Sequence, residues 1–286
     1  MASDNASGPH SLGIIYAEES GQGLAHPFFV QILDSFKQEA ERLGYDVTFI
    51  NHNAEGNKLS YLERSRLCKV DGVCMVCVDF SSPEIKELAL SDMPCVTVDH
   101  IFKKVPAVLS DNERGVQSLV EYAVKRGHRR IAFVHGHNNS VVTRSRIQQF
   151  YNTMDYYGYP VPPEYVKSGL YEDIPLTRKL VLELLELPER PTCILLPDDI
   201  TYLGAQDAAK EMGLRIPEDI SFTGYDGIPL SQVLSPRLTT VHQSMEEIGS
   251  VSAKRLVDLI EHPDTVNRFP SVFPVTLVEG ETVAEL

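Results

Sequence analysis

The sequence predicts an α/β protein of two lobes, each a parallel sheet flanked by helices. The chain has 286 residues, which exceeds the usual size of a single domain. Short apolar runs typical of buried strands alternate with segments of helical periodicity, a pattern that indicates a parallel sheet. The alternation starts again after residues 108–136, so we expect two similar halves.

In the first half, helix 28–43 is the clearest element. Phe29, Ile32 and Phe36 fall on one face of it, and Gly44 supplies a stop. The other expected elements are strands at 11–17, 47–50, 73–78 and 95–98 and helices at 59–67 and 83–90.

The expected strand 73–78 contains a C-x-x-C pair, Cys74 and Cys77. Such a pair can bind zinc or act in redox chemistry, but a zinc site needs further ligands and a redox pair usually opens a helix. The neighbouring residues are apolar, so we interpret the pair as part of a core strand. Five cysteines, an odd number, indicate reduced thiols in a reducing compartment.

The central stretch 108–136 joins the halves as strand, helix and strand. Asp111 and Asn112 are good helix caps, Gly127 ends the helix, and Ile131 begins a buried strand. Beyond it we expect helices at 144–157, 176–187, 201–212 and 245–260, and strands at 165–168, 193–196, 220–224 and 272–278.

Charge and composition restrict the partners. The formal net charge is −14, so the chain repels phosphate backbones and we expect it not to bind DNA by itself. No apolar run approaches the roughly 20 residues of a membrane helix, which predicts no membrane partner. Residues 1–10 lack the basic and apolar parts of a secretory signal, and we expect a flexible leader on a cytoplasmic protein.

A series of short motifs runs through the chain from Ser11 to Val283. In order they are His-Pro-Phe-Phe at 26–29, Val-Asp-Gly at 70–72, Pro-Cys-Val-Thr-Val-Asp at 94–99, Gly-His-Arg-Arg-Ile-Ala at 127–132, Arg-Ile-Gln-Gln-Phe at 146–150, Ile-Pro-Glu-Asp-Ile-Ser at 216–221, Gly-Tyr-Asp at 224–226 and Leu-Thr-Thr-Val-His-Gln at 238–243. In this order the motifs resemble the lactose-repressor/galactose-repressor (LacI/GalR) family of bacterial transcriptional regulators.

The resemblance implies the ligand-sensing core of such a regulator, with two Rossmann-like lobes of the type I periplasmic-binding-protein kind. It implies a first lobe of residues 11–111 plus 243–262 and a second of 112–242 plus 263–286. It further implies a homodimer, and contact with operator DNA only through an N-terminal segment of about sixty residues that precedes the core in the family. The alternatives are a sugar-binding protein not tied to DNA and, less favoured, a two-lobed hydrolase.

Ligands of open parallel sheets bind beyond the carboxyl ends of the strands, which predicts a site in the cleft between the lobes. Polar and aromatic residues at such positions are candidates, and the resemblance favours a small sugar or sugar derivative as effector. The expected effector-binding residues are Phe28, Asp99, Arg146, Tyr171, Asp198, Asp226 and Gln243; Glu18, Glu19, Asp79 and Arg144 are further strand-end or helix-end candidates.

Each candidate has a structural alternative: the aspartates can cap turns, the aromatic rings can be core, and Arg146 can be a solvated helix charge. Asp198 departs from the family, which usually has asparagine there. A carboxylate only accepts hydrogen bonds, and this suggests an effector richer in donors. No motif of a hydrolase, nucleotide-binding or metalloprotease site is present, and His135-Gly136-His137 lacks further ligands. We therefore expect neither catalysis nor a cofactor or metal.

Overall fold

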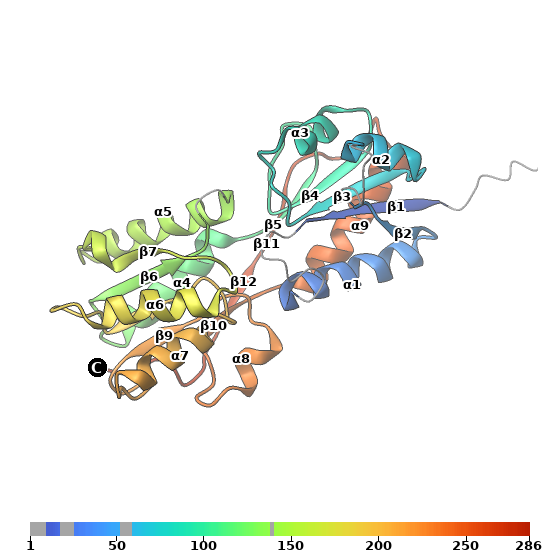
Figure 1. The fold of residues 1–286 in the computed structure, drawn as a ribbon. Helices are drawn as coiled ribbons and strands as arrows, with labels where there is room; N and C mark the ends of the chain where they lie inside the picture. Colours follow the sequence, from blue (N-terminus) through green and yellow to red (C-terminus); the bar gives the residue numbers. More distant parts are fainter. Residues whose placement is uncertain (1–9, 18–25, 52–58, 138–139) are drawn as a thin grey trace, which may run out of the picture. The chain divides into compact units, whose positions relative to one another are not determined.

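The computed structural model describes residues 10–17, 26–51, 59–137 and 140–286. The expected leader, Glu18 and Glu19 fall outside the described residues, apart from His10. The chain forms two compact units, Met1–Ser110 with Ser244–Phe273 and Asp111–Gln243 with Pro274–Leu286. The chain thus passes between the units at three points (Figure 1).

Unit 1 contains a six-stranded sheet in the order β11-β5-β4-β3-β1-β2. All neighbouring strands in it are parallel. The strands are β1 (Ser11–Tyr16), β2 (Asp46–Phe49), β3 (Gly72–Val76), β4 (Cys95–Val98), β5 (Ala107–Ser110) and β11 (Ser271–Phe273), and the helices are α1 (Pro27–Arg42), α2 (Tyr61–Leu67), α3 (Pro83–Leu90) and α9 (Met245–Glu261).

Helices α1 and α9 pack closely because α9 carries Gly249 at the contact. A Cβ atom there would lie 2.3 Å from the carbonyl oxygen of Ile32. The predicted cysteine strand is correct for Cys74, which is buried in β3, but it ends earlier than expected. Cys77 lies beyond β3 with a left-handed φ of 50°, and both cysteines are free thiols.

Unit 2 contains a four-stranded parallel sheet in the order β7-β6-β8-β9 and a two-stranded antiparallel ribbon, β10-β12. The strands are β6 (Ile131–His135), β7 (Val166–Ser168), β8 (Cys193–Leu195), β9 (Ser221–Thr223), β10 (Thr240–Gln243) and β12 (Val275–Val278), and the helices are α4 (Asn112–Lys125), α5 (Val141–Tyr156), α6 (Ile174–Leu185), α7 (Tyr202–Glu211) and α8 (Pro229–Val233).

The sheet of unit 2 is buried on both faces. Ala132 and Val134 of β6 pack in one core with α6 and α7. Ile131 and Phe133, which alternate with them, pack in the other core with α4 and α5. Strands that are covered on both faces have continuous apolar sequences, and this pattern predicted them.

The return of the chain near its end differs from the prediction. Residues 263–273 were expected in the second lobe and 272–278 as a single strand. Instead β11 pairs in parallel with β5 of unit 1, whereas β12 pairs with β10 of unit 2. Pro274 separates the two strands; proline has no backbone N–H to donate to a ladder, so a strand tends to be interrupted there.

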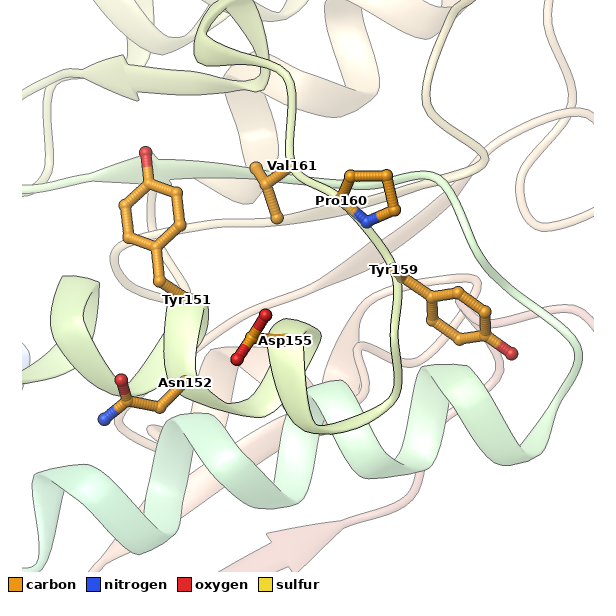
Figure 2. Close-up of a pocket in the computed structure, with 6 residues that line it drawn as sticks. All are labelled: Tyr151, Asn152, Asp155, Tyr159, Pro160 and Val161. Carbon is orange, nitrogen blue, oxygen red and sulfur yellow. The ribbon is translucent and has the colours of Figure 1, made fainter.

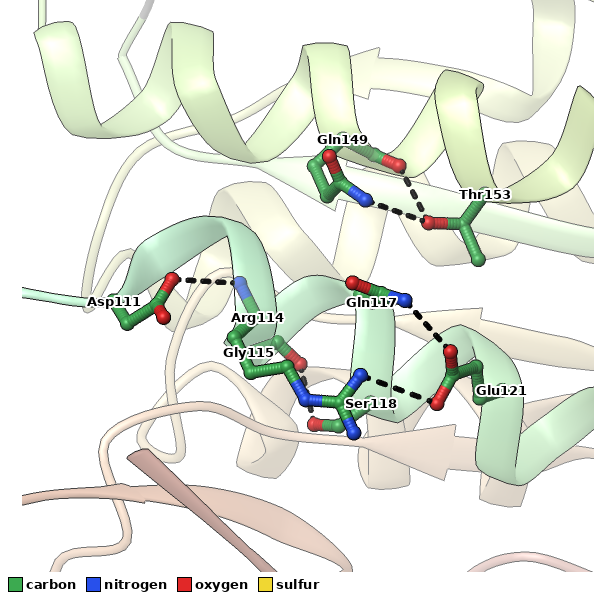
Figure 3. Close-up of polar contacts among 8 residues, drawn as sticks. All are labelled: Asp111, Arg114, Gly115, Gln117, Ser118, Glu121, Gln149 and Thr153. Carbon is green, nitrogen blue, oxygen red and sulfur yellow. Dashed lines mark hydrogen bonds and ion pairs between the residues drawn. The ribbon is translucent and has the colours of Figure 1, made fainter. Parts of the chain in front are cut away.

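Local capping explains where the helices around the centre begin. The Asp111 side chain accepts a hydrogen bond from the backbone N–H of Arg114 at 2.9 Å and so caps α4. Ser140 caps α5 in the same way, and α5 therefore begins at Val141, earlier than the predicted 144. Figure 3 shows α4 beside α5, with Asp111 at the start of α4.

Within the described ranges, no helix has the length and apolar character needed to cross a membrane.

Candidate functional site

The carboxyl ends of the unit 2 strands carry a group of buried polar side chains. Tyr171 and Glu172 follow β7, Asp198 and Asp199 follow β8, and Asp226 follows β9. Gln243 ends β10, and Arg146 reaches the group from α5. Five of the seven predicted effector-binding residues thus belong to unit 2; Phe28 and Asp99 belong to unit 1.

Arg146 is buried, with 5% of its surface exposed. Its Nε donates to Oδ1 of Asn112 at 2.8 Å, and Nη1 donates to the carbonyl oxygen of Pro197 at 3.2 Å. Its Cζ lies 3.5 Å from the centre of the Tyr225 ring, within the range of a cation–π interaction. These contacts exclude a solvated surface charge and fix the guanidinium in one orientation.

Asn112 and Tyr225 are site residues that sequence reasoning missed. From the sequence, Asn112 was interpreted as a helix cap. In the structure Asp111 caps α4, and Asn112 instead accepts a hydrogen bond from Arg146. Tyr225 read only as part of a family motif. The one available signal was Gly115: a Cβ there would lie 2.0 Å from the Tyr225 Oη, so a glycine inside a helix marks the close approach of this ring.

Asp226 and Gln243 form a buried pair. Gln243 Nε2 donates to Asp226 Oδ1 at 2.7 Å, and the backbone N–H of Gln243 donates to the carbonyl oxygen of Asp226 at 3.1 Å. Asp226 has a left-handed φ of 103°, which is strained for a residue other than glycine. Burial raises its pKa well above the ordinary value, and the positive charge of Arg146 opposes that shift.

Asp198 and Asp199 bind the protein's own backbone. Asp198 accepts hydrogen bonds from the N–H groups of Glu172 and Thr201, each at 2.8 Å and each on a different carboxylate oxygen. An asparagine could accept only one of these, so the departure from the family at Asp198 has a structural reason. Its role in effector binding stays a prediction.

Asp199 is held in the same manner. It accepts from the N–H of Ile228 at 2.9 Å and from the hydroxyl of Thr240 at 2.5 Å. Burial is the largest cause raising its pKa, to about 8, and the nearby Asp198 adds to the shift. Burial also raises the pKa of Asp198, against the hydrogen bonds that it accepts.

Tyr171 lies against the end of β6. Its Oη and the hydroxyl of Thr143 are 2.8 Å apart, and a Cβ on Gly136 would lie 2.2 Å from its ring. Burial is the largest cause raising its pKa. Tyr171 thus occupies a fixed place beside α5, the helix that carries Arg146.

The two candidates in unit 1 lie in different settings. Phe28 is buried and packs edge-on against Phe29, with ring centres 5.0 Å apart. Asp99 follows β4 with a left-handed φ of 59°, and its N–H donates to the carbonyl oxygen of Val108 at 3.0 Å. Their contact with an effector stays a prediction.

Two surface hollows of unit 2 lie on residues other than these candidates. One, of about 340 Å³, is lined by Tyr151, Asn152, Asp155, Tyr159, Pro160 and Val161. Figure 2 shows its lining around the end of α5 and the chain that follows it. The other, of about 690 Å³, lies along α7 and is lined by Leu203, Gln206, Asp207, Lys210, Gly213, Leu214, Ile216 and Pro236.

Comparison with known proteins places these features in a family. Residues 120–283 match the periplasmic binding protein-like domain. The HTH-type transcriptional repressor PurR of Haemophilus influenzae (strain PittEE) is 30% identical over 241 residues, which cover 83% of this chain and 71% of the repressor.

Solved structures agree with the sequence match. A regulatory protein of the LacI family from Chloroflexus aggregans superposes with a TM-score of 0.83 at 27% identity, over 96% of this chain and 99% of that one. A LacI family transcriptional regulator from Enterococcus faecium, solved with bound ribose, has a TM-score of 0.81 at 24% identity over 96% and 99% of the two chains. The predicted fold of two Rossmann-like lobes, of the periplasmic-binding-protein kind, is confirmed.

Proposed function

Because this chain belongs to the LacI/GalR family of transcriptional regulators, we propose that Arg146, Asp226 and Gln243 bind its small-molecule effector. The chain is the effector-binding core of such a regulator, and its relatives are regulators of transcription, not enzymes. Effector occupancy of this core changes how the regulator acts at operator DNA.

The arrangement around Arg146 carries this proposal. A buried guanidinium and a buried carboxyl lie at the carboxyl ends of parallel strands, where ligands of such sheets bind. Both groups are held by neighbours before any ligand arrives: Arg146 by Asn112 and Pro197, and Asp226 by Gln243. Such preorganised polar groups bind hydroxyls without a further cost of ordering.

A sugar or sugar derivative is the proposed effector class. Guanidinium and carboxylate groups form charge-assisted hydrogen bonds with adjacent hydroxyls, and aromatic faces pack on the apolar face of a sugar ring. The Enterococcus faecium regulator of the same fold binds ribose, which supports this class. Tyr171 and Asp198 in unit 2 and Phe28 and Asp99 in unit 1 are the remaining proposed contacts.

Calorimetric titration of the purified chain with pentoses, hexoses and disaccharides tests the proposal. We expect saturable binding of at least one member, and its loss in Asp226→Ala. The matched control is Asp155→Ala, an exposed aspartate of the same unit, which should bind as the parent does. Equal binding by the parent and Asp226→Ala would refute the placement of the site.

We also propose that the core forms a homodimer through the outer face of α7 and α8. Val233 of α8 is 78% exposed and Met212, next to α7, is 39% exposed. The hollow along α7 adds Leu203 and Leu214, beside the polar Gln206, Asp207 and Lys210. Exposed apolar patches of this kind mark protein contacts, and a second copy of the chain fits the symmetry of the family's assemblies.

A further inference from the structure

Acidic side chains outnumber basic ones among the buried polar residues at the strand ends of unit 2. Four carboxyl groups are each less than a tenth exposed: Glu172, Asp198, Asp199 and Asp226. Among the residues that the structure describes, Arg146 is the one buried arginine or lysine. Burial disfavours the ionised form of such carboxyls, and a ligand that brings positive charge into the site would favour that form.

The hydrogen bonds show which carboxyl is left for a ligand. Both carboxylate oxygens of Asp198 and both of Asp199 accept hydrogen bonds from the protein. Asp226 accepts one, from Gln243 on Oδ1. Its Oδ2 receives none from the described part of the chain, so this oxygen can accept from an effector.

Gln243 supplies a second, independent sign of a missing donor. The residue is 2% exposed, and its Oε1 has no hydrogen-bond partner among the described residues. A buried acceptor without a donor destabilises a folded protein. Because the same amide donates to Asp226, its orphan oxygen and the open Oδ2 of Asp226 belong to one small region of unit 2.

We infer that the effector presents a protonated nitrogen to Asp226 and Gln243, and that it is an amino sugar or another polyol bearing a primary amine. An ammonium group has three donors and no acceptor, so it can serve both open oxygens and balance the Asp226 charge at once. A neutral hydroxyl donates one hydrogen bond and adds no positive charge beside Asp226. This inference rests on the proposed effector site and names the ligand class of that site.

The alternative effector is a neutral sugar that binds protonated Asp226. The pH dependence of binding distinguishes these two effector classes. The charged or titratable groups around Asp226 are Arg146 from α5, Asp198 and Asp199 after β8, Tyr171 after β7, and His242 of β10, whose backbone bridges to Asp226. Glu172, next to Tyr171, donates its backbone N–H to Asp198. An ammonium ligand needs ionised Asp226, so its binding releases a proton and tightens as the pH rises toward the pKa of that carboxyl. A neutral ligand held by the protonated acid weakens over the same range.

The test is calorimetric titration of the full chain with matched pairs: D-glucosamine and D-glucose, D-galactosamine and D-galactose, D-mannosamine and D-mannose. Titrations run between about pH 5.5 and about pH 7, below the range in which an amine of the α-amino kind loses its proton. We expect at least one amino sugar to bind about tenfold more tightly than its hydroxyl partner, the gain from a charged donor over a neutral one. Its affinity should increase with pH.

Asp226→Asn removes the charge and keeps the shape, so it should abolish the tenfold preference, whereas the exposed control Asp155→Asn should keep it. A neutral sugar that binds as tightly as its amino partner in the parent protein overturns this inference and leaves the proposed function standing. Failure of every member of both series to bind contradicts the proposed function as well. The comparison within each pair uses the parent protein and holds even if a variant folds poorly.

Discussion

Gln243 and Asp226 are joined twice, by a side-chain hydrogen bond of 2.7 Å from Nε2 to Oδ1 and by a backbone hydrogen bond of 3.1 Å. The first bond orients a buried carboxyl. The second holds the backbone of Gln243, the last residue of β10, beside the backbone of Asp226, which follows β9. The pair therefore fixes the position of the residue that follows β9 relative to the last residue of β10.

Gln243→Leu should lower the free energy of unfolding by about 1–3 kcal/mol, because it leaves the buried Asp226 without its donor. Urea denaturation measures the change. Gln148→Leu on the exposed face of α5 is the matched control and should have an effect within about 0.5 kcal/mol. Equal effects of the two substitutions would mean that the pair contributes nothing specific.

Arg146→Ala should reduce both stability and effector binding. It removes a buried guanidinium together with its hydrogen bonds to Asn112 and to the Pro197 carbonyl, which should cost about 3 kcal/mol in the free energy of unfolding. Effector affinity should fall by about one to two orders of magnitude. Gln148→Ala, on an exposed position of the same helix, should change neither quantity appreciably. Unaltered stability of Arg146→Ala would contradict the contacts described.

The contribution of Asp199 to the free energy of unfolding should decrease as the pH rises from about 4 to about 8. Burial raises the pKa of this carboxyl from an ordinary 3.8 to about 8, so in that window the folded protein holds a proton that the unfolded chain has lost. The unfolded state then binds fewer protons, and the free energy of unfolding falls with pH until the folded carboxyl also ionises. Asp199→Asn should flatten this slope in urea titrations made across the window, and Asp155→Asn should not. A parent slope identical to that of Asp199→Asn would count against the buried acid.

Gly115→Ala should weaken effector binding through Tyr225. The added Cβ would lie 2.0 Å from Oη of Tyr225 and 2.8 Å from its Cζ, so the ring must move away from the Arg146 guanidinium. Overpacking of this kind costs about 1–3 kcal/mol of stability, and titration of the effector should show a reduced affinity. Ser118→Ala in the same helix is the control. An affinity unchanged by Gly115→Ala would show that the ring does not help to position Arg146.

Val233→Glu should convert the proposed dimer to a monomer. It places a charge in the apolar face of α8, and the added negative charge repels a partner that is itself acidic at −14. Light scattering at tens of micromolar, on the order of common assay concentrations, measures the mass. Leu90→Glu is an equally exposed apolar position in unit 1 and should leave the dimer intact. A parent protein that is already monomeric would refute the proposal.

Much of the fold follows from patterns among residues that are close together in the sequence, so these features could be predicted. The buried strands were predicted because residues such as Ile131 to Val134 are apolar on both faces, and the helices because their apolar residues repeat at helical spacing. Strand-end candidates such as Asp226 followed from the rule that parallel sheets bind ligands at their carboxyl edge. These features depend on residues close together in the chain.

Other features depend on contacts between residues far apart in the chain, and only the tertiary structure decided them. Asn112 holds Arg146 because α4 lies against α5, and nothing in the residues around Asn112 indicates that neighbour. Asp198 accepts hydrogen bonds from Glu172 and Thr201, of which Glu172 comes from a different strand-end loop. The division of 272–278 at Pro274 required knowing that β5 and β10 are the separate partners of the two pieces. A pattern along the chain predicts on which face of its element a side chain lies. The group that the side chain contacts there belongs to another element, distant in sequence, and only the packing of the two elements brings them together.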